Sequence, residues 1–162
     1  MAKAYFAGGC FWCVTPTFRR LPGVLKVTSG YCGGSEADPD YASVKAQRTG
    51  HRETVEVEYD PARVSYGDLC GAFLRDVDPF DGGGQFIDRG RSYTLAAYYT
   101  SGEERSVMEA KLRTLEAREG RPVFVALEPF QRFWPAEEEH QDFDLRHPEA
   151  LEEELRTSGR KK

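Results

Sequence analysis

The order of the apolar segments along the chain constrains its fold more than any other feature. Six segments show either the alternation of a strand or the spacing of three to four residues that places apolar side chains on one face of a helix. They read strand, helix, strand, strand, helix, strand, over Lys3–Ala7, Cys10–Leu21, Val24–Tyr31, Glu53–Tyr59, Ser65–Asp76 and Leu95–Thr100. This order predicts an α+β fold, a two-layer ferredoxin-like split βαβ sandwich.

A charged helix over Glu103–Glu119 and a strand over Val123–Leu127 are expected to extend this sandwich. Extensive coil at residues 35–52 and 78–92 interrupts it, and long irregular loops in a compact domain usually carry function. The length of 162 residues and the hydrophobic content of 40% suffice for one core. We predict a single catalytic domain over residues 1–162, in which about 144–162 form a polar C-terminal tail with a solvated basic end, Arg160-Lys161-Lys162.

Charge and the length of the apolar runs exclude several classes of protein. The formal net charge is -5, and no clustered basic face is evident, which argues against a nucleic-acid partner. The apolar run before Gly8 is too short for a signal peptide or a membrane span. We therefore expect a monomeric cytoplasmic protein with no membrane and no nucleic-acid partner.

The chain has four cysteines, and in a reducing compartment these are more often catalytic or metal-bound than structural. Cys10 follows a predicted strand and two glycines at the start of a predicted helix, where free N–H groups and the helix dipole favour a thiolate. The glycines leave room for a substrate beside the sulfur. A buried structural cysteine is the alternative. The glycines, together with Cys13 three residues later, favour a nucleophile.

Cys10 and Cys13 form a Cys-x-x-Cys pair with two possible uses. One is a redox couple, and the other is half of a zinc site that isolated histidines would complete, namely His51, His140 or His147. The sequence has no second Cys-x-x-Cys pair and no two histidines at zinc spacing. Phe11 and Trp12 suit an apolar pocket better than a metal knuckle, so we predict neither a metal nor a cofactor.

Gly9-Cys10-Phe11-Trp12 resembles the signature of the A-type peptide methionine sulfoxide reductases. Further segments are similar to motifs of that family in the same order: Gly30 to Gly34, Tyr41, Thr49 to Glu53, Tyr59 to Pro61, Asp78-Pro79, Gly84 to Gly90, Ser92-Tyr93, Pro135 to Glu137 and His140 to Phe143. The resemblance implies a peptide-methionine (S)-S-oxide reductase. Such an enzyme reduces methionine S-sulfoxide, free or in oxidised proteins, repairs those proteins and is recycled by thioredoxin.

The same resemblance implies roles for individual residues. Cys10 would attack the substrate sulfur, and Glu53, kept neutral by partial burial, would protonate the sulfoxide oxygen. Tyr41 and Tyr93 would hold that oxygen, and Asp88 would help to order the site. From the residues alone, Glu53 would be a solvated strand residue and the tyrosines would simply pack.

Phe11 and Trp12 would line a pocket for the methyl group of the substrate, because that end of methionine sulfoxide is apolar. Plain core packing is compatible with the same two positions. The chain departs from the family at Thr15, where relatives often have glutamate, and at Thr94, where many have arginine. Both departures leave substrate affinity open.

After the attack, Cys10 would be a sulfenic acid, which a second thiol must resolve before an external donor reduces the product. Many relatives have glycine in place of Cys13 and carry resolving cysteines in a C-terminal tail, whereas no cysteine follows Cys70 here. We rank Cys13 first as the resolving thiol. Cys32, in a glycine-rich loop, ranks second, and Cys70 is expected in the core.

Two other interpretations of the chain stay open. A general dithiol-disulfide oxidoreductase would use Cys10 and Cys13 without any sulfoxide substrate, and Glu53 and the two tyrosines would then be dispensable. A small zinc-binding module is the non-enzymatic alternative.

Overall fold

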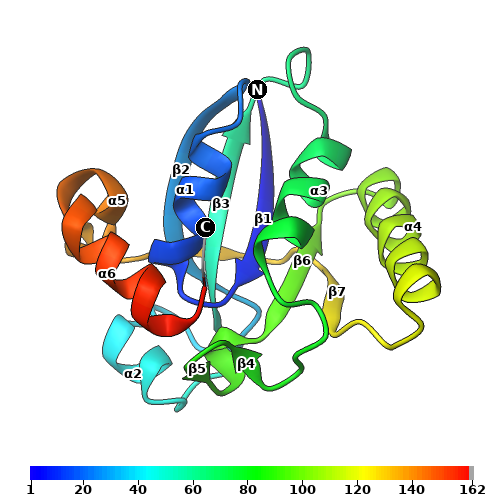
Figure 1. The fold of residues 1–162 in the computed structure, drawn as a ribbon. Coiled ribbons are helices and arrows are strands. Elements are labelled where there is room, and N and C mark those ends of the chain that lie inside the picture. The colour runs from blue at the N-terminus through cyan, green and yellow to red at the C-terminus, as the bar shows by residue number, and fades with distance from the viewer. Residues whose placement is uncertain (161–162) are drawn as a thin grey trace.

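The structure, a computed structural model, describes residues 1–160 and confirms the predicted α+β sandwich (Figure 1). Its main sheet has six strands in the order β7-β6-β1-β3-β2-β8. The strands are β1 (Ala2–Gly8), β2 (Val24–Cys32), β3 (Arg52–Tyr59), β6 (Leu95–Tyr99), β7 (Val125–Pro129) and β8 (Phe133–Pro135). The central four strands pair antiparallel, β7 is parallel to β6, and β8 is antiparallel to β2. The central order is that of a split βαβ unit.

Helices α1 (Phe11–Arg19) and α3 (Tyr66–Asp76) pack on one face of the sheet, with α4 (Gly102–Glu119) beside α3. The ring of Phe6 on β1 lies 5.0 Å from that of Phe18 and 5.2 Å from that of Phe73. All three are fully buried, and burial of such side chains is worth about 1.5–3 kcal/mol each. This contact joins both helices to the middle of the sheet.

The start of α3 confirms the expected cap at Ser65. The Ser65 hydroxyl accepts the N–H of Asp68 at 3.0 Å, and the Asp68 carboxylate accepts the N–H of Ser65 at 3.1 Å. This reciprocal capping box satisfies backbone donors that a helix start leaves free. The cap therefore sets where α3 begins.

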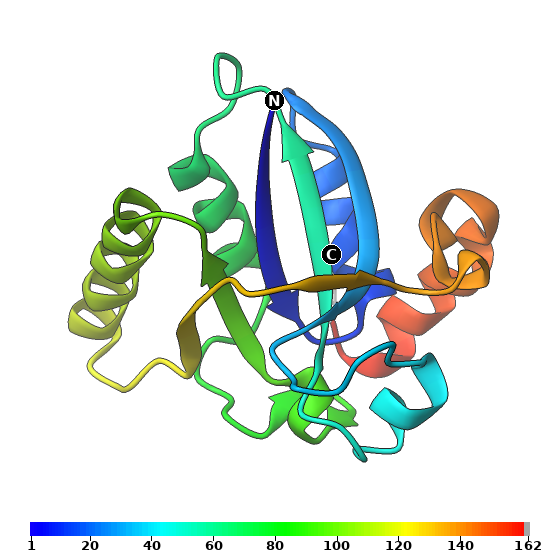
Figure 2. The same ribbon diagram turned by 180° about the vertical axis from the view of Figure 1, so that it is seen from behind.

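The opposite face of the sheet is covered by the chain between β7 and α5, which crosses in front of the strands in Figure 2. Phe130 in this segment stacks on Tyr5 with ring centroids 4.0 Å apart, and Phe133 packs beside it. Strand β8 belongs to this segment and was not among the predicted elements. Its three residues end in proline and are too few to show an alternation.

The irregular stretches gather at the end of the sheet where α1 begins, as Figure 1 shows for α2, the β4–β5 hairpin and α6. These shorter elements are α2 (Tyr41–Lys45), β4 (Gly84–Gln85), β5 (Asp88–Arg89), the 3₁₀ turns η1 (Arg91–Tyr93) and η2 (Glu138–His140), α5 (Phe143–Arg146) and α6 (Pro148–Ser158). None of the helices in residues 1–160 combines the length and the apolar character needed to span a bilayer.

The end of the described chain corrects one expectation. Arg160 was expected to be solvated, but it is 2% exposed. Its guanidinium pairs with Asp76 at 3.1 Å and donates to the backbone oxygen of Gly8 at 2.6 Å, so tertiary partners replace water. Lys161 and Lys162, the rest of the predicted basic end, lie outside the described residues.

Candidate active site

Cys10 stands where β1 turns sharply into α1, as the glycines before it predict. It is the N-cap of α1, and Gly9 before it has a φ of +88°. A Cβ added to Gly9 would lie 2.8 Å from the Cβ of Gln85 and 2.8 Å from a guanidinium nitrogen of Arg160. Only glycine fits this turn without strain. The turn leaves Cys10 nearly buried, at 7% exposure.

Cys13 lies beside Cys10 on the first turn of α1, and the two thiols share a hydrogen bond. This hydrogen bond and burial raise the pKa of Cys10 well above its ordinary value, and the carboxyl groups of Glu53 and Asp88 raise it further. The start of the helix does not outweigh these effects. The thiolate expected at this position is therefore not the resting form, and Cys10 rests as a neutral thiol.

Glu53 on β3 reaches the same turn from the sheet. It is 1% exposed, and its Oε1 accepts the N–H of Phe11 at 3.1 Å. Its Oε2 is buried without a hydrogen-bond partner in the described part of the chain. Burial raises the pKa of Glu53 to about 8. The hydrogen bond from the Phe11 N–H and the charge of Lys45 lower this pKa, whereas the carboxylate of Asp88 raises it. The side chain is therefore a neutral acid at neutral pH, with one oxygen free to donate.

Tyr41, at the start of α2, and Tyr93, at the end of η1, complete the group that the sequence predicted. Burial raises the pKa of both phenols, and Glu53, Asp88 and Cys10 all contribute to the rise. A carboxylate oxygen of Asp88 lies within 4.8 Å of the Cys10 sulfur. Burial also raises the pKa of Asp88. The fold thus brings together five residues from five separate elements.

An aromatic wall flanks these groups. Phe11 is 1% exposed, and Trp12 is half-buried. Phe143 of α5 stacks on Trp12 at 4.2 Å with an interplanar angle of 11°, and His140 stacks on Tyr41 at 4.1 Å. The indole Nε1 of Trp12 is buried with no hydrogen-bond partner among residues 1–160. Residues from four elements build this wall, so Phe11 and Trp12 are not its only members.

The other two cysteines are not brought to the site. Cys32 lies in the cluster on the opposite face of the sheet and donates to the backbone oxygen of Arg132 at 3.2 Å. Cys70 lies on the buried face of α3 in the core, as expected. Burial is the main cause that raises the pKa of each thiol to about 12. Of the four cysteines, Cys13 is the one that lies beside Cys10.

Sequence reasoning missed two contributions to the site. Glu154 on α6 places a carboxylate oxygen within 4.8 Å of both the Cys10 sulfur and Asp88, and nothing in its acidic helix marks it out. Glu137 accepts the hydroxyl of Tyr31 at 2.8 Å and the N–H of Tyr41 at 3.0 Å, which holds the start of α2. Its motif was visible in the sequence, but its anchoring contacts were not.

Potential metal ligands in the described residues form one group, made of Cys10, Asp88 and Glu154. None of the three histidines considered for zinc belongs to it. His51 instead accepts the N–H of Gly34 at 3.1 Å with Nδ1 and pairs Nε2 with a backbone oxygen at 2.8 Å. The zinc site proposed as an alternative is therefore not assembled from those histidines.

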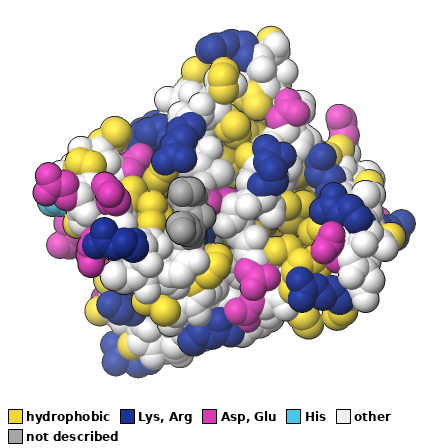
Figure 3. Space-filling view, viewed as in Figure 1, with side chains coloured by type: hydrophobic (Ala, Val, Ile, Leu, Met, Phe, Trp, Pro, Cys, Tyr) yellow, Lys and Arg dark blue, Asp and Glu magenta, His cyan; other side chains and the backbone are white. Residues whose placement is uncertain are grey.

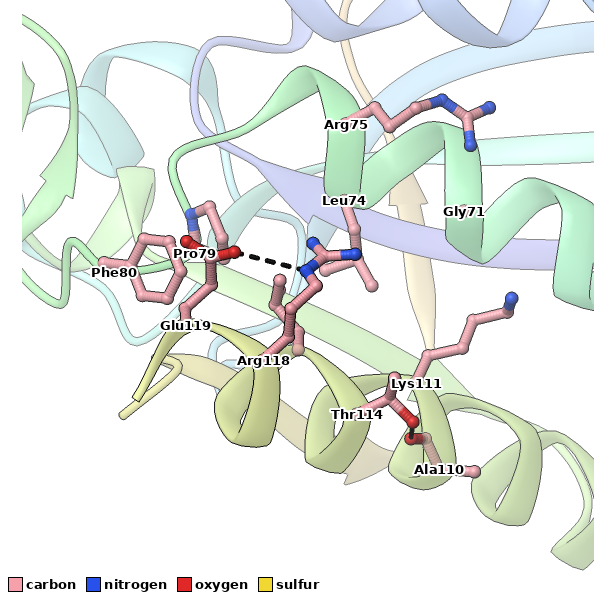
Figure 4. Close-up of a pocket in the computed structure, with 11 residues that line it drawn as sticks. Gly71, Leu74, Arg75, Pro79, Phe80, Ala110, Lys111, Thr114, Arg118 and Glu119 are labelled. Atoms are coloured by element: carbon pink, nitrogen blue, oxygen red, sulfur yellow. Dashed lines mark hydrogen bonds and ion pairs between the residues drawn. The ribbon is translucent and has the colours of Figure 1, made fainter. Parts of the chain in front are cut away.

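A cavity of about 630 Å³ lies away from this site, between α3 and α4 (Figure 4). Leu74, Pro79 and Phe80 line it, and the basic side chains of Lys111 and Arg118 border it. In Figure 3, hydrophobic side chains show at the surface of this region among Lys and Arg. None of the residues expected to act in catalysis lines this cavity.

The chain and its fold are similar to known proteins. A family model described as Peptide methionine sulfoxide reductase matches residues 2–162. Peptide methionine sulfoxide reductase MsrA 2 of Rhizobium meliloti (strain 1021) is 50% identical over 147 residues, 90% of this chain and 72% of that protein. The structure of methionine sulfoxide reductase A of Corynebacterium diphtheriae has a TM-score of 0.81 at 28% identity, covering 90% of this chain and 74% of the other.

A more distant likeness is to the crystal structure of Mxr1 from Saccharomyces cerevisiae in complex with Trx2. It has a TM-score of 0.60 at 18% identity and covers 86% of this chain and 83% of that chain. This likeness concerns the fold.

Proposed function

The chain belongs to the peptide methionine sulfoxide reductase family, and from that premise we propose that Cys10 attacks the sulfur of methionine S-sulfoxide while Glu53 protonates its oxygen. The observation that carries this proposal is the unpartnered Oε2 of Glu53. A buried, neutral carboxylic acid beside a buried thiol is the arrangement that sulfoxide chemistry requires.

The first step transfers the sulfoxide oxygen to Cys10. Sulfur of Cys10 bonds to the substrate sulfur, and the oxygen takes a proton from Glu53, which the thiol proton of Cys10 replaces. Collapse of this adduct breaks the bonds from the substrate sulfur to oxygen and to Cys10 while the oxygen bonds to the Cys10 sulfur, which leaves methionine and a sulfenic acid on Cys10. Tyr41 and Tyr93 donate hydrogen bonds to the oxygen, and Asp88 orders the site.

The second step resolves the sulfenic acid. Sulfur of Cys13 attacks sulfur of Cys10, which forms a disulfide and releases the oxygen as water. The position of Cys13 beside Cys10 supports this role over that of Cys32, which lies on the far face of the sheet. A thioredoxin dithiol then supplies two electrons and two protons to restore both thiols. The yeast relative solved with Trx2 supports thioredoxin as this donor.

The aromatic wall binds the apolar end of the substrate. Phe11 and Trp12 contact the methyl group, and the rings of Tyr41, His140 and Phe143 enclose them. Both free methionine sulfoxide and oxidised proteins are substrates, so the enzyme repairs oxidised proteins. Four free thiols suit a reducing compartment, and we place the enzyme in the cytoplasm.

The experiment that tests this function supplies the S and R epimers of methionine sulfoxide separately, each with thioredoxin and its reducing system, and follows methionine formation. We expect turnover with the S epimer alone. Absence of turnover with both epimers, combined with rapid reduction of an unrelated protein disulfide, would instead support the general dithiol-disulfide oxidoreductase.

A further inference from the structure

Arg160 is a buried cation whose contacts join the end of the chain to its beginning. It is 2% exposed and follows α6. Its Nη1 lies 3.1 Å from a carboxylate oxygen of Asp76, and its Nη2 donates to the backbone oxygen of Gly8 at 2.6 Å. The guanidinium carbon lies 5.0 Å from the ring centroid of Phe86. Burying a charge this completely is unfavourable unless it is paired and hydrogen-bonded.

The same side chain lies against the turn that presents Cys10. Nη2 of Arg160 would be 2.8 Å from a Cβ on Gly9, the residue directly before the nucleophile. Burial lowers the pKa of Arg160, whereas Cys13, Cys10 and Asp88 raise it, so the thiols and the guanidinium lie within electrostatic reach. An arginine keeps its charge even when its pKa falls.

Burial and the neighbouring groups Cys13, Glu53 and Asp88 oppose a negative charge on the Cys10 sulfur. The groups that face it come from every surrounding element: Cys13 of α1, Tyr41 of α2, Glu53 of β3, Asp88 of β5, Tyr93 of η1 and Glu154 of α6. Lys45 acts on Glu53 and Asp88. A thiolate on Cys10 must therefore form among carboxyl groups, and a buried cation nearby offsets that repulsion.

We propose that Arg160 is a positioning residue for the reaction at Cys10: its guanidinium holds the Gly8-Gly9 turn in place and supplies the positive charge against which the Cys10 thiolate forms. This role rests on the proposed sulfoxide reduction, because that reaction is what requires the thiolate. The C-terminal helix α6 is then part of the site, since it delivers Arg160 to the turn.

Stability alone does not account for these contacts. A buried ion pair often contributes little net stability, because desolvation of both charges offsets their attraction. Asp76 is 3% exposed at its side chain, so the pair with Arg160 is of this kind. Apolar side chains at positions 76 and 160 together would avoid that desolvation. The positive charge of Arg160 instead stabilises the thiolate of Cys10.

The test measures how fast iodoacetamide alkylates Cys10 across a range of pH, because the thiolate is the form that reacts. Cys13→Ser serves as the common background, so that Cys10 is the one thiol on tryptic peptide 4–19 and mass spectrometry reports it alone. Arg160→Gln should raise the midpoint of the pH profile by about one unit and slow alkylation near pH 7.5 about tenfold. Arg160→Lys, which keeps the charge, should restore most of the shift.

Arg156→Ala is the matched control, because it removes the same charge four residues earlier, at an exposed position on α6 that is paired with Glu153. It should leave the midpoint unchanged. If Arg160→Gln does not fold, the double variant Asp76→Asn/Arg160→Gln removes both charges and leaves no carboxylate buried against a missing cation. An unchanged midpoint in either folded neutral variant overturns the proposal, and so does an equal shift in Arg156→Ala.

Turnover separates this proposal from the proposed function. With Cys13 present, Arg160→Gln should lower kcat for methionine S-sulfoxide about tenfold and leave KM within about twofold, because the charge acts on the thiol rather than on the substrate. If the wild-type chain turns over but the midpoint does not move, the role of Arg160 fails and the function stands. A moved midpoint without wild-type turnover overturns the function and keeps the charge effect of Arg160 on Cys10.

Discussion

Cys10 and Cys32 are two buried thiols: Cys10 follows strand β1, and Cys32 ends strand β2. The groups around the two sulfurs differ. Cys10, 7% exposed, lies beside Cys13 and the neutral acid Glu53. Cys32, 1% exposed, packs among aromatic rings and donates its proton to the backbone oxygen of Arg132. Both thiols have a raised pKa, so burial by itself does not distinguish the reactive one.

The two regions differ in the groups that can exchange a proton with the thiol or stabilise a charge on its sulfur. Around Cys10, an acid, two phenols and a guanidinium come from separate elements, and a second thiol lies beside it. At Cys32 the thiol donates a hydrogen bond to a carbonyl, the cluster around it is apolar or aromatic, and the charged neighbours Arg52 and Glu128 pair with each other at 3.3 Å. A reductase site is therefore defined by the neighbours of the sulfur rather than by the sulfur.

The largest expected effect is the loss of turnover when Cys10 is replaced. Cys10→Ser should lower the rate of methionine formation by about 10⁴-fold or more, because a hydroxyl cannot replace the thiolate as nucleophile. The measurement is turnover of methionine S-sulfoxide with thioredoxin, with circular dichroism as the control for folding. A folded variant that retained even a tenth of wild-type turnover would contradict the assignment of Cys10.

Glu53→Gln tests the neighbour rather than the sulfur. It should lower kcat about 10²- to 10³-fold, because an amide cannot protonate the sulfoxide oxygen. The alkylation rate of Cys10 at neutral pH should stay within about twofold, since the acid is already neutral there. Near-normal turnover in this variant would favour the general oxidoreductase, for which Glu53 is dispensable.

Cys13→Ser distinguishes the two candidate resolving thiols. One methionine should still form per enzyme in a single turnover, whereas steady-state turnover with thioredoxin should fall at least about tenfold, because the sulfenic acid is no longer resolved locally. Mapping the disulfide of the wild type after one turnover checks the same point. A disulfide between Cys10 and Cys32 would instead identify Cys32 as the thiol that resolves the sulfenic acid.

The pH dependence of stability sharpens the comparison at Glu53. Its pKa in the folded chain is raised to about 8, above an unfolded value of about 4.3. The folded state thus binds one more proton in this window, and its contribution to stability is full below pH 4.3 and is lost as pH rises through about 8. Urea unfolding should show a free energy that falls by about 1.4 kcal/mol per pH unit relative to Glu53→Gln. Parallel curves for the two proteins would contradict a buried neutral acid.

The smallest expected effect on turnover comes from replacing Cys32. Cys32→Ala should leave kcat within about twofold and lower the free energy of unfolding by about 1 kcal/mol, because the change removes a packed sulfur and one hydrogen bond. Turnover and urea unfolding check this together. Loss of turnover in a stable variant would bring Cys32 back as the resolving thiol.

Much of the architecture was predictable because its signals are local. The spacing of apolar residues predicted both ends of α3 to within one residue, and serine at position 65 predicted its N-cap. The order of elements then predicted the central sheet, since the connections of a split βαβ unit allow few arrangements. Strand β8 was not predictable in this way, because three residues become a strand only through hydrogen bonds to β2.

The site was predictable in part. The glycines and Cys10 pointed to a nucleophile at a sharp turn, and the motifs supplied Glu53, Tyr41, Tyr93 and Asp88 by resemblance. Residue type could not show that Cys10 would rest as a neutral thiol, because that depends on how deeply the fold buries it and on which groups lie beside it. Neither could the charged pattern of α6 show which of its side chains point inward.

The sequence by itself indicated the central elements, the turn at Gly9 and Cys10 as the candidate nucleophile, since each depends on residues within a few positions of one another. The tertiary structure decided the chemistry around that nucleophile. Glu53 is a neutral acid because the folded chain buries it away from water, although the N–H of Phe11, 42 positions away, favours its charged form. Arg160 is buried because it meets Gly8 across 152 positions. Such long-range contacts exist only when the whole chain has folded, so no local pattern can encode them.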